Sequence, residues 1–551
     1  MCCVLFVLCI QASEELSIAG MTFTTFDLGG HAQAGIENNM RVVDVYGPGS
    51  QNKAMSCSGV FVNSQSGIVV CTGIVFSGFI NEHFTKNDLK MMYSDNFCKD
   101  MKVYIDYTKR IDVSENYNKS ITDRPNVIRQ EGKLLMMVNC LEFQDALNKI
   151  FKRADNWGFY SGSEDTGVQE DSRFLSWFAF LQVPTSSTYS ESVPWLKSCN
   201  LQKGFSVLAC GSPFGGLCPD LFMNTISKGI VSNLAGDENA LILTDARCLP
   251  GTEGGGLFVS HEDRAYLVGL IISPLCWKSE EWIGLTLVCS VHLILKNMLK
   301  AVESQESLTM PSDFINKSFQ APLTNNVRSV CVHYPDVALI DAGYLWGSGI
   351  LLNQQLVLTC RHVVKDKSVL TVKANMGGRF HTVSGKVLYS SATSSPYDIA
   401  VVKLQKPVLN IPTPRFATHF HPGEDVVVIG YGALGGSSGP SLTSGILSRV
   451  ITHQSQPVML QTTCAVQAGA SGGAVVRPST GELLGVVSSN TRDFSAKVTY
   501  PHLNFSIPVT VLEPLVRLFA QTGNATVFKA LDNAEEDVRK TWRLQSIQSK
   551  L

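Results

Sequence analysis

The chain is 551 residues long, which exceeds what a single hydrophobic core usually organises, so its length predicts two or three domains. Charged residues make up 17% of it, and 45 Lys plus Arg nearly balance 47 Asp plus Glu. This balance argues against a nucleic-acid-binding protein. No apolar run approaches the roughly 18 residues of a membrane-spanning helix, so we expect no membrane span.

The first ten residues, Met1–Ile10, are apolar and similar to the core of a secretory signal. No basic residue precedes this stretch, and the first one in the chain is Arg41, so we do not expect secretion. The sixteen cysteines show no regular spacing and no CxxC metal motif. We therefore expect no disulfide framework.

Three segments of the first half recur in the same order in the second half. Cys57–Gly73 parallels Gly347–His362, Val207–Asn233 parallels Val427–Arg449, and Gly251–Gly256 parallels Gly469–Ala474. Short runs of Val, Ile, Leu and Phe, separated by Gly, Pro, Ser and Asn, recur in both halves and are typical of short strands closed into barrels. The sequence therefore predicts an all-β protein that contains two copies of one fold.

Polar segments containing Ser and Pro indicate how the copies are divided. We expect a first domain over 1–300, a linker over 301–325, a second domain over 326–525 and a tail over 526–551. The polar stretches 112–135 and 160–173 predict a loop inserted in the first copy. Apolar spacing predicts a helix over 509–521, and residues 534–545 permit another that would carry the tail outward.

A glycine-rich turn of the second copy, Gly469-Ala-Ser471-Gly-Gly473, holds the first candidate catalytic residue. Small residues on both sides of Ser471 allow a sharp turn that presents backbone N–H groups to a tetrahedral oxyanion. Taken alone, the pattern is a moderate signal, because glycine-rich turns that contain Ser are common. Its weight depends on the residues that accompany it.

Two further residues complete a catalytic set. His362 ends an apolar strand, where an imidazole can act as general base at a barrel rim. Asp398 directly precedes the apolar run Ile399–Val402, a position from which a carboxylate can orient the imidazole. Each would have a structural role if it stood alone. Together they follow the order His, Asp, Ser that is found in chymotrypsin, so we predict a triad and two tandem chymotrypsin-like double β-barrels.

The same fold assigns further roles around the nucleophile. The amides of Gly469 and Ser471 are predicted to form the oxyanion hole. Ala465, six residues before Ser471, lines the bottom of the primary pocket, and its small neutral side chain predicts an uncharged residue at the cleaved position. We expect the pocket wall and substrate-binding edge to be formed by Val487, Ser488 and Ser489.

The first copy has lost these chemical groups. The repeat alignment puts Glu253 at the nucleophile position, Gly73 at the His position and a residue near Trp177 at the Asp position. No triad is possible there, so we expect a degenerate, non-catalytic copy. It either regulates, binds substrate or mediates assembly, or it gives structural support alone.

At these residues the second half resembles the trypsin-like proteases of the Deg and HtrA type, including Leu442–Ser448 and Asn504–Pro508. The whole chain is similar to the family of peroxisomal processing proteases at Leu243–Gly256, Gln461–Ala465 and Tyr500–Val509. The chain also ends in Ser549, Lys550 and Leu551, a peroxisomal address that an import receptor reads. We therefore expect a peroxisomal matrix location.

The resemblance to the peroxisomal family implies an endopeptidase that removes N-terminal leaders from imported matrix proteins and cleaves some C-terminally addressed ones. It also implies self-cleavage and leaders cut beside a Cys. Oligomeric state stays open, with a homo-oligomer as one possibility. No cofactor and no metal are expected, because His419 and His421 lack further ligands nearby and Gly430–Gly435 lacks the helix of a dinucleotide site.

Two other functions compete with this interpretation. Protease folds can lose activity, so the chain could be a non-catalytic, chaperone-like or regulatory binding protein, against which the intact triad residues argue. A secreted digestive-type protease is opposed by the absence of bridging cysteine pairs beside His362 and Ser471 and by the C-terminal tripeptide.

Overall fold

The structure is a computed structural model. It describes residues 42–47, 55–63, 66–80, 90–99, 101–108, 127–151, 157–159, 174–184, 193–214, 219–261, 264–274, 276–278, 281–303, 333–376, 379–432, 434–493 and 498–543. The apolar N-terminal stretch, nearly all of the predicted linker, the 160–173 loop and the C-terminal tripeptide lie outside the described residues.

The first half contains two rings of antiparallel strands. The first ring runs β1 (Val42–Gly47), β2 (Met55–Asn63), β3 (Ile68–Thr72), β8 (Trp177–Gln182), β6 (Val127–Asn139) and β5 (Val103–Thr108), with β4 (Met91–Tyr93) beside β6. The second is a closed barrel of β9 (Ser206–Gly211), β10 (Thr225–Ala235), β11 (Leu241–Thr244), β16 (Thr286–Ser290), β13 (Arg264–Ser273) and β12 (Gly256–His261).

Short elements surround these rings. They are the helices α3 (Leu141–Ile150), α4 (Pro219–Phe222) and α5 (Val291–Glu303), the 3-10 turns η2 (Ile74–Phe79), η3 (Ser94–Asn96), η7 (Ser198–Asn200) and η8 (Asp237–Asn239), and a small sheet of β7 (Trp157–Phe159), β14 (Cys276–Lys278) and β15 (Glu281–Trp282).

The second half repeats both rings in the same strand order. Its first barrel contains β17 (Val337–Asp341), β18 (Trp346–Leu351), β19 (Leu356–Thr359), β22 (Ala400–Leu404), β21 (Arg379–Ser390) and β20 (Val369–Met376). Its second contains β23 (Asp425–Gly430), β24 (Ser441–His453), β25 (Gln456–Thr462), β28 (Val498–Pro508), β27 (Leu483–Asp493) and β26 (Ala474–Val476). The prediction of an all-β protein with tandem chymotrypsin-like double barrels is confirmed.

The barrel interiors are filled by aliphatic and aromatic side chains, which supply most of the free energy of folding. Val70 and Phe180 are fully buried in the first half, as are Val401 and Val486 in the second. The last described elements of the chain are α8 (Val509–Thr522), η10 (Ala525–Asn533) and α9 (Glu536–Trp542), and η9 (Gly435–Ser437) lies between β23 and β24.

Two expectations about local structure were wrong. The stretch 112–135 was expected to be a loop, but its described part, from Val127, is strand β6, in which Arg129 pairs with Asp106 of β5 at 2.7 Å. The C-terminal helices do not lead outward. Phe528 is 1% exposed in the core, and Trp542 Nε1 donates a 3.1 Å hydrogen bond to Val458 O.

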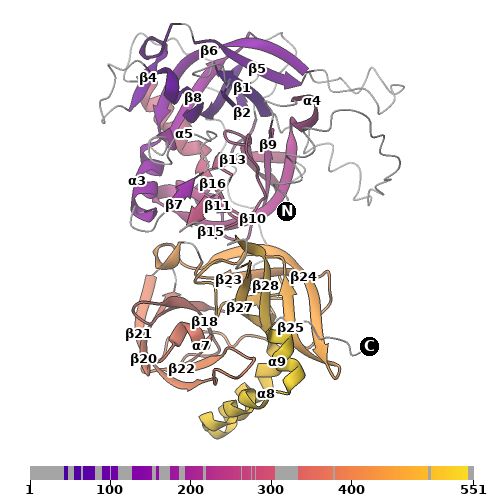
Figure 1. The fold of residues 1–551 in the computed structure, drawn as a ribbon. Helices are drawn as coiled ribbons and strands as arrows, with labels where there is room; N and C mark the ends of the chain where they lie inside the picture. Colours follow the sequence, from indigo (N-terminus) through magenta and orange to yellow (C-terminus); the bar gives the residue numbers. More distant parts are fainter. Residues whose placement is uncertain are drawn as a thin grey trace, which may run out of the picture.

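The second barrels of the two halves contact each other where β10 lies beside β24, and β15 of the small sheet lies beside β28 (Figure 1). Asp245, 6% exposed, accepts hydrogen bonds from the backbone N–H and the hydroxyl of Ser444 across this junction. Lys203 Nζ donates to the carbonyls of Ser438 and Pro440 at 2.7 and 2.8 Å. The junction is therefore polar and specific as well as apolar.

Candidate active site

His362 and Asp398 meet because two neighbouring strands end at the same place. β19 pairs with β22 antiparallel, with Thr359 opposite Ala400, so the residues just beyond both strands lie at one barrel rim. The four-residue helix α7 (Arg361–Val364) carries His362 there. Its backbone N–H donates to Asp398 Oδ1 at 3.1 Å, and its Nδ1 hydrogen-bonds Asp398 Oδ2.

The Asp398 carboxylate is held in its charged form. Burial raises the pKa of this carboxyl, but the hydrogen bond and charge of His362 and the nearby Arg361 guanidinium outweigh burial and lower the pKa below its ordinary value. Arg361 Nε lies 3.5 Å from Asp398 Oδ1. A carboxylate in this position orients the imidazole and leaves Nε2 directed away from it.

The loop that carries Ser471 connects β25 to β26 and has two left-handed glycines. Gly469 has φ +92° and Gly472 has φ +83°. A Cβ at Gly469 would lie 2.1 Å from a ring carbon of Trp346, so both the backbone conformation and the space require glycine there. Neither the Gly469 nor the Ser471 N–H donates a hydrogen bond within the described part of the chain.

Ser348 of β18 holds this loop in place. Its hydroxyl donates to Gly469 O at 2.7 Å and accepts from Tyr431 N–H at 2.8 Å, and its own N–H donates to Ser471 O at 2.8 Å. Ser348 is fully buried. Sequence reasoning did not identify this residue, although it stands one position before the repeated Gly-Ile or Gly-Val step of the duplicated hairpin.

The Ser471 hydroxyl donates to Ser488 O at 3.3 Å, and no hydrogen bond joins it to His362 among the described residues. Catalytic hydrogen bonds of this kind are often loose without substrate and tighten in the complex. The structure thus brings His362 and Asp398 into direct contact. The Ser471 loop has a turned conformation in which the N–H groups of Gly469 and Ser471 have no acceptor among the described residues.

The predicted pocket residues fall into different environments. Ala465 and Ser488 are 2% and 5% exposed, whereas Ser489 is exposed. The side chain of Val487 is fully buried, and its carbonyl accepts hydrogen bonds from Gly472 N–H at 2.7 Å and Cys360 Sγ at 3.2 Å. Val487 therefore fixes the loop from within the core and cannot contribute a side chain to a pocket wall.

Cys360, His362 and Asp398 offer three ligand atoms within 4.8 Å of one another. Burial raises the pKa of the Cys360 thiol well above its ordinary value, and the thiol donates to Val487 O. Metal binding requires a thiolate, which this environment disfavours. The cluster is better explained by the residues of the proposed triad with a buried cysteine behind them.

The first copy keeps the loop architecture without the chemistry. Ser58 Oγ donates to Gly251 O at 2.7 Å and Ser58 N–H donates to Glu253 O at 2.8 Å, as Ser348 does to Gly469 and Ser471. Gly251 and Gly254 have φ +98° and +82°. Glu253 therefore occupies the nucleophile position, as the repeat alignment predicts.

The Glu253 side chain folds back onto its own loop. Its Oε2 accepts a 2.7 Å hydrogen bond from the N–H of Gly251, the counterpart of Gly469. The other oxygen, Oε1, is buried without a partner among the described residues. Burial raises the pKa of Glu253 to about 7.

The strand registers correct one detail of the alignment. Gly59 pairs with Cys71 where Gly349 pairs with Thr359, so the residue that corresponds to His362 is Ile74 and not Gly73. The first hairpin is longer and carries a bulge between Phe61 and Asn63, which accounts for the offset. The registers of β8 and β22 show that Trp177 is the residue of the first copy that corresponds to Asp398, as expected.

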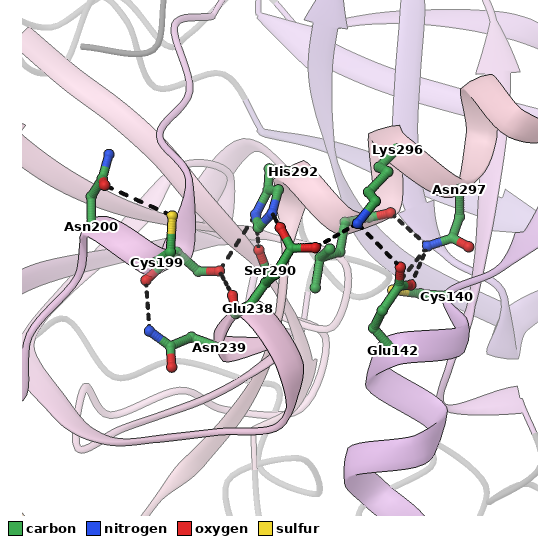
Figure 2. Close-up of polar contacts among 12 residues, drawn as sticks. Cys140, Glu142, Cys199, Asn200, Glu238, Asn239, Ser290, His292, Lys296 and Asn297 are labelled. Carbon is green, nitrogen blue, oxygen red and sulfur yellow. Dashed lines mark hydrogen bonds and ion pairs between the residues drawn. The ribbon is translucent and has the colours of Figure 1, made fainter. Parts of the chain in front are cut away.

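A separate cluster in the first copy contains Ser, His and Glu (Figure 2). His292 Nδ1 lies 2.8 Å from Ser290 Oγ, and its Nε2 lies 3.1 Å from a carboxylate oxygen of Glu238, which also pairs with Lys296. Burial lowers the pKa of His292 despite the Glu238 contact. Because Ser290 is fully buried, no substrate can reach its hydroxyl, and the cluster anchors α5 to η8.

The comparisons with known proteins agree with this geometry. The trypsin-like peptidase domain family matches residues 347–486. The chain is 37% identical over 533 residues to the "Peroxisomal leader peptide-processing protease" of Mus musculus, covering 89% of this chain and 92% of that protein. The Homo sapiens protein of the same name is 37% identical over 527 residues, with the same coverage. "Serine protease Do-like HtrA" of Lactobacillus helveticus is 29% identical over 194 residues, 33% of this chain and 45% of that protein.

The chain is a serine endopeptidase of the trypsin-like class. It has the tandem barrels of that class, a His–Asp contact at a barrel rim and a serine, Ser471, in a glycine-rich turn. Within that class the chain belongs to the peroxisomal leader peptide-processing protease family, since its similarity to the mouse and human members extends over both copies. It is a peroxisomal enzyme. No helix among the described residues is long and apolar enough to cross a membrane.

Proposed function

We propose that His362, Asp398 and Ser471 are the catalytic triad of a serine endopeptidase. Ser471 Oγ attacks the scissile carbonyl while His362 takes its proton, and His362 then returns that proton to the leaving amine. Asp398 keeps the imidazole in the required tautomer and stabilises the imidazolium. Water repeats the same proton transfers and releases the acyl group from Ser471.

The oxyanion of each tetrahedral intermediate is bound by the N–H groups of Gly469 and Ser471. What supports this role is that neither amide has an acceptor among the described residues, while Ser348 holds the carbonyls of Gly469 and Ser471 in place. We assign Ala465 to the floor of the primary pocket, and Ser488 and Ser489 to the edge on which an extended substrate adds as a strand. Val487 supports that edge through its backbone.

We infer that the substrates are imported peroxisomal matrix proteins, from which the enzyme removes N-terminal leaders next to a Cys. Support comes from the names of the mouse and human relatives and from the neutral Ala465. Cleavage of some C-terminally addressed proteins, self-cleavage, homo-oligomerisation and import through Ser549–Leu551 belong to the same proposal.

The observation that carries the proposal is the double contact of His362 with Asp398, through Nδ1 and through the backbone N–H, at the rim that faces the Ser471 loop. Asp398 keeps its charge there, as a carboxylate that orients an imidazole must. The rival non-catalytic role has no comparable feature to support it.

The test compares the full-length protein with Ser471→Ala and, as a matched control, Glu253→Ala at the equivalent position of the first copy. Each is incubated with a leader-bearing peroxisomal matrix protein, and the product is sized by mass spectrometry. We expect trimming by the wild type and Glu253→Ala and a loss of at least about 10³-fold for Ser471→Ala. Equal trimming by Ser471→Ala would refute the triad.

For the first copy we propose a supporting role that requires no chemistry of its own. Glu253, Ile74 and Trp177 replace all three triad members, yet the loop hydrogen bonds persist. The division at 301–325 remains a prediction. The predicted tail is better assigned to the second copy, since Phe528 and Leu531 belong to its core.

A further inference from the structure

One segment of the first copy reaches the residue assigned to the floor of the primary pocket. This segment begins at Trp282, the last residue of β15, and continues through residues 283–285 to the start of β16. A Cβ at Gly284 would lie 3.3 Å from the Cβ of Ala465 and 3.1 Å from Nε2 of His502. The space between Gly284 of the first copy and Ala465 is thus too small for a side chain at position 284. We call residues 282–285 the floor segment.

A buried hydrogen bond fixes the floor segment to the nucleophile loop. Gln467 Nε2 donates to Ile283 O at 2.7 Å, and the two residues are 8% and 3% exposed. The backbone carbonyl of Gln467 accepts from Ala470 N–H at 3.0 Å within the turn that precedes Ser471. One glutamine therefore contacts the first copy with its side chain and shapes the nucleophile turn with its backbone.

A contact between two rings also joins the floor segment to the second copy. The indole of Trp282 packs edge to face on the His502 imidazole, with centroids 5.5 Å apart. His502 Nδ1 is 3.1 Å from Thr463 O, on the strand end that leads to Ala465. Ala465 is consequently enclosed by β28 on its own copy and by the floor segment of the other.

We propose that the floor segment of the first copy closes the base of the primary specificity pocket of the second copy. The inference rests on the proposed function and deepens it, because it names what the non-catalytic copy does. Ala465 contributes one methyl group and Gly284 no side chain, so the floor is uncharged, and the packed segment behind it limits the pocket depth. The pocket accepts small uncharged side chains such as Cys and Ala and excludes long ones such as Leu or Arg.

The test measures kcat/KM for peptides that differ only at the cleaved position, Ala against Leu, in the full-length protein. Trp282→Ala removes the ring behind His502, and Trp282→Phe keeps a ring there. Lys203→Met is the matched control. It also breaks a contact between the two copies, but that contact is made to the carbonyls of Ser438 and Pro440, in a different loop from Ala465. Gln467→Met removes the donor to Ile283 O at similar volume.

We expect the wild type to prefer Ala, and Trp282→Ala and Gln467→Met to reduce the Ala-to-Leu ratio about tenfold, the scale of a change of one or two methylenes in a pocket. Trp282→Phe and Lys203→Met keep the wild-type ratio. An unchanged ratio in both Trp282→Ala and Gln467→Met, or an equal change in Lys203→Met, would overturn the proposal.

A failure of the proposed function would give a different result from a failure of the floor-segment proposal. If Ser471→Ala cleaves as fast as the wild type, the triad is wrong, whatever the ratios are. Binding of the same peptides to Ser471→Ala, followed by fluorescence anisotropy with and without Trp282→Ala, reports the pocket without turnover. A Trp282-dependent preference in binding supports the floor segment even then, and its absence counts against it.

Discussion

The hydroxyl of Ser348 donates a 2.7 Å hydrogen bond to the carbonyl of Gly469, and through it the first barrel of the catalytic copy fixes the loop of the second barrel. The equivalent bond in the other copy joins Ser58 to Gly251, also at 2.7 Å. The same pair of hydrogen bonds therefore exists twice in the chain, once beside Ser471, the proposed nucleophile, and once beside Glu253.

Ser348→Ala removes one hydrogen bond to Gly469 O and leaves the N–H of Tyr431 without its acceptor. We expect a loss of about 1–2 kcal/mol in unfolding free energy and a fall in kcat of about tenfold or more, with KM little changed, since the amide of Gly469 is misplaced. Ser58→Ala, measured in parallel by thermal unfolding and peptide hydrolysis, should cost similar stability and leave kcat unchanged. A fall in kcat for both variants would contradict the role assigned to Ser348.

Gly469→Ala places a methyl group against Trp346 at a backbone conformation that favours glycine. The loop must move, and one oxyanion donor is lost, which corresponds to about 3 kcal/mol of activation free energy, or 10²-fold in kcat. Hydrolysis of a leader peptide under saturating conditions measures this effect. Gly251→Ala serves as the control, because Gly251 has a similar left-handed conformation and its added methyl group would meet the backbone of Phe214. It should lower stability without the specific loss of kcat.

Glu253 makes stability depend on pH in a direction opposite to that of a salt-bridged carboxylate. Burial raises its pKa to about 7 in the folded state, from 4.5 for an unperturbed glutamate. The folded protein thus binds the proton more tightly than the unfolded chain, so this contribution is complete below about pH 4.5 and is lost as the pH rises to about 7. Glu253→Gln removes the dependence. Chemical denaturation from pH 5 to 8 measures the free energy of unfolding of both proteins. Relative to the wild type, that of the variant should rise by at most about 3 kcal/mol over this range. Parallel pH profiles of the two proteins would disprove the raised pKa of Glu253.

Asp245 ties the two copies together by accepting from Ile230 N–H in its own copy and from Ser444 in the other. Asp245→Ala leaves these buried donors without an acceptor and should destabilise the protein by about 2–4 kcal/mol. Thr463, its counterpart in the second copy, accepts only from Ile446 N–H among its described side-chain contacts, and Thr463→Ala should cost about 1 kcal/mol. Limited proteolysis would then cut Asp245→Ala between the copies first, whereas equal sensitivity of the two variants would argue against a tie at this residue.

The sequence was sufficient for the repeated barrels and for the contact of His362 with Asp398, because strand patterns and the ends of paired strands are local signals. It was insufficient where contacts with residues distant in the sequence determine the local structure. Residues 127–135 are polar enough to suggest a loop, but β5 on one side and β8 on the other supply the hydrogen bonds that make them a strand. The offset between Gly73 and Ile74 arises from a bulge that no spacing rule reveals.

The packing of the two copies was equally beyond sequence reasoning. The contacts of Gln467 with Ile283 and of Trp282 with His502 join segments about two hundred residues apart, and neither side carries a recognisable motif. The position of the Glu253 carboxylate on Gly251 N–H also depends on a rotamer choice within a buried loop. Such features follow from shape complementarity, which residue types alone do not specify.

The loop around Glu253 keeps its left-handed glycines and its hydrogen bond from Ser58. In a protease, the residues of such a loop usually serve both folding and turnover, and the two requirements are hard to separate. In the second copy, we expect a substitution in the loop to affect both folding and turnover, so the inactivity of a variant would have two explanations. In the first copy, the equivalent loop is required only for folding. Each substitution around Ser471 can therefore be calibrated against its twin around Glu253, and the protein provides its own reference for how much of an active-site defect is conformational.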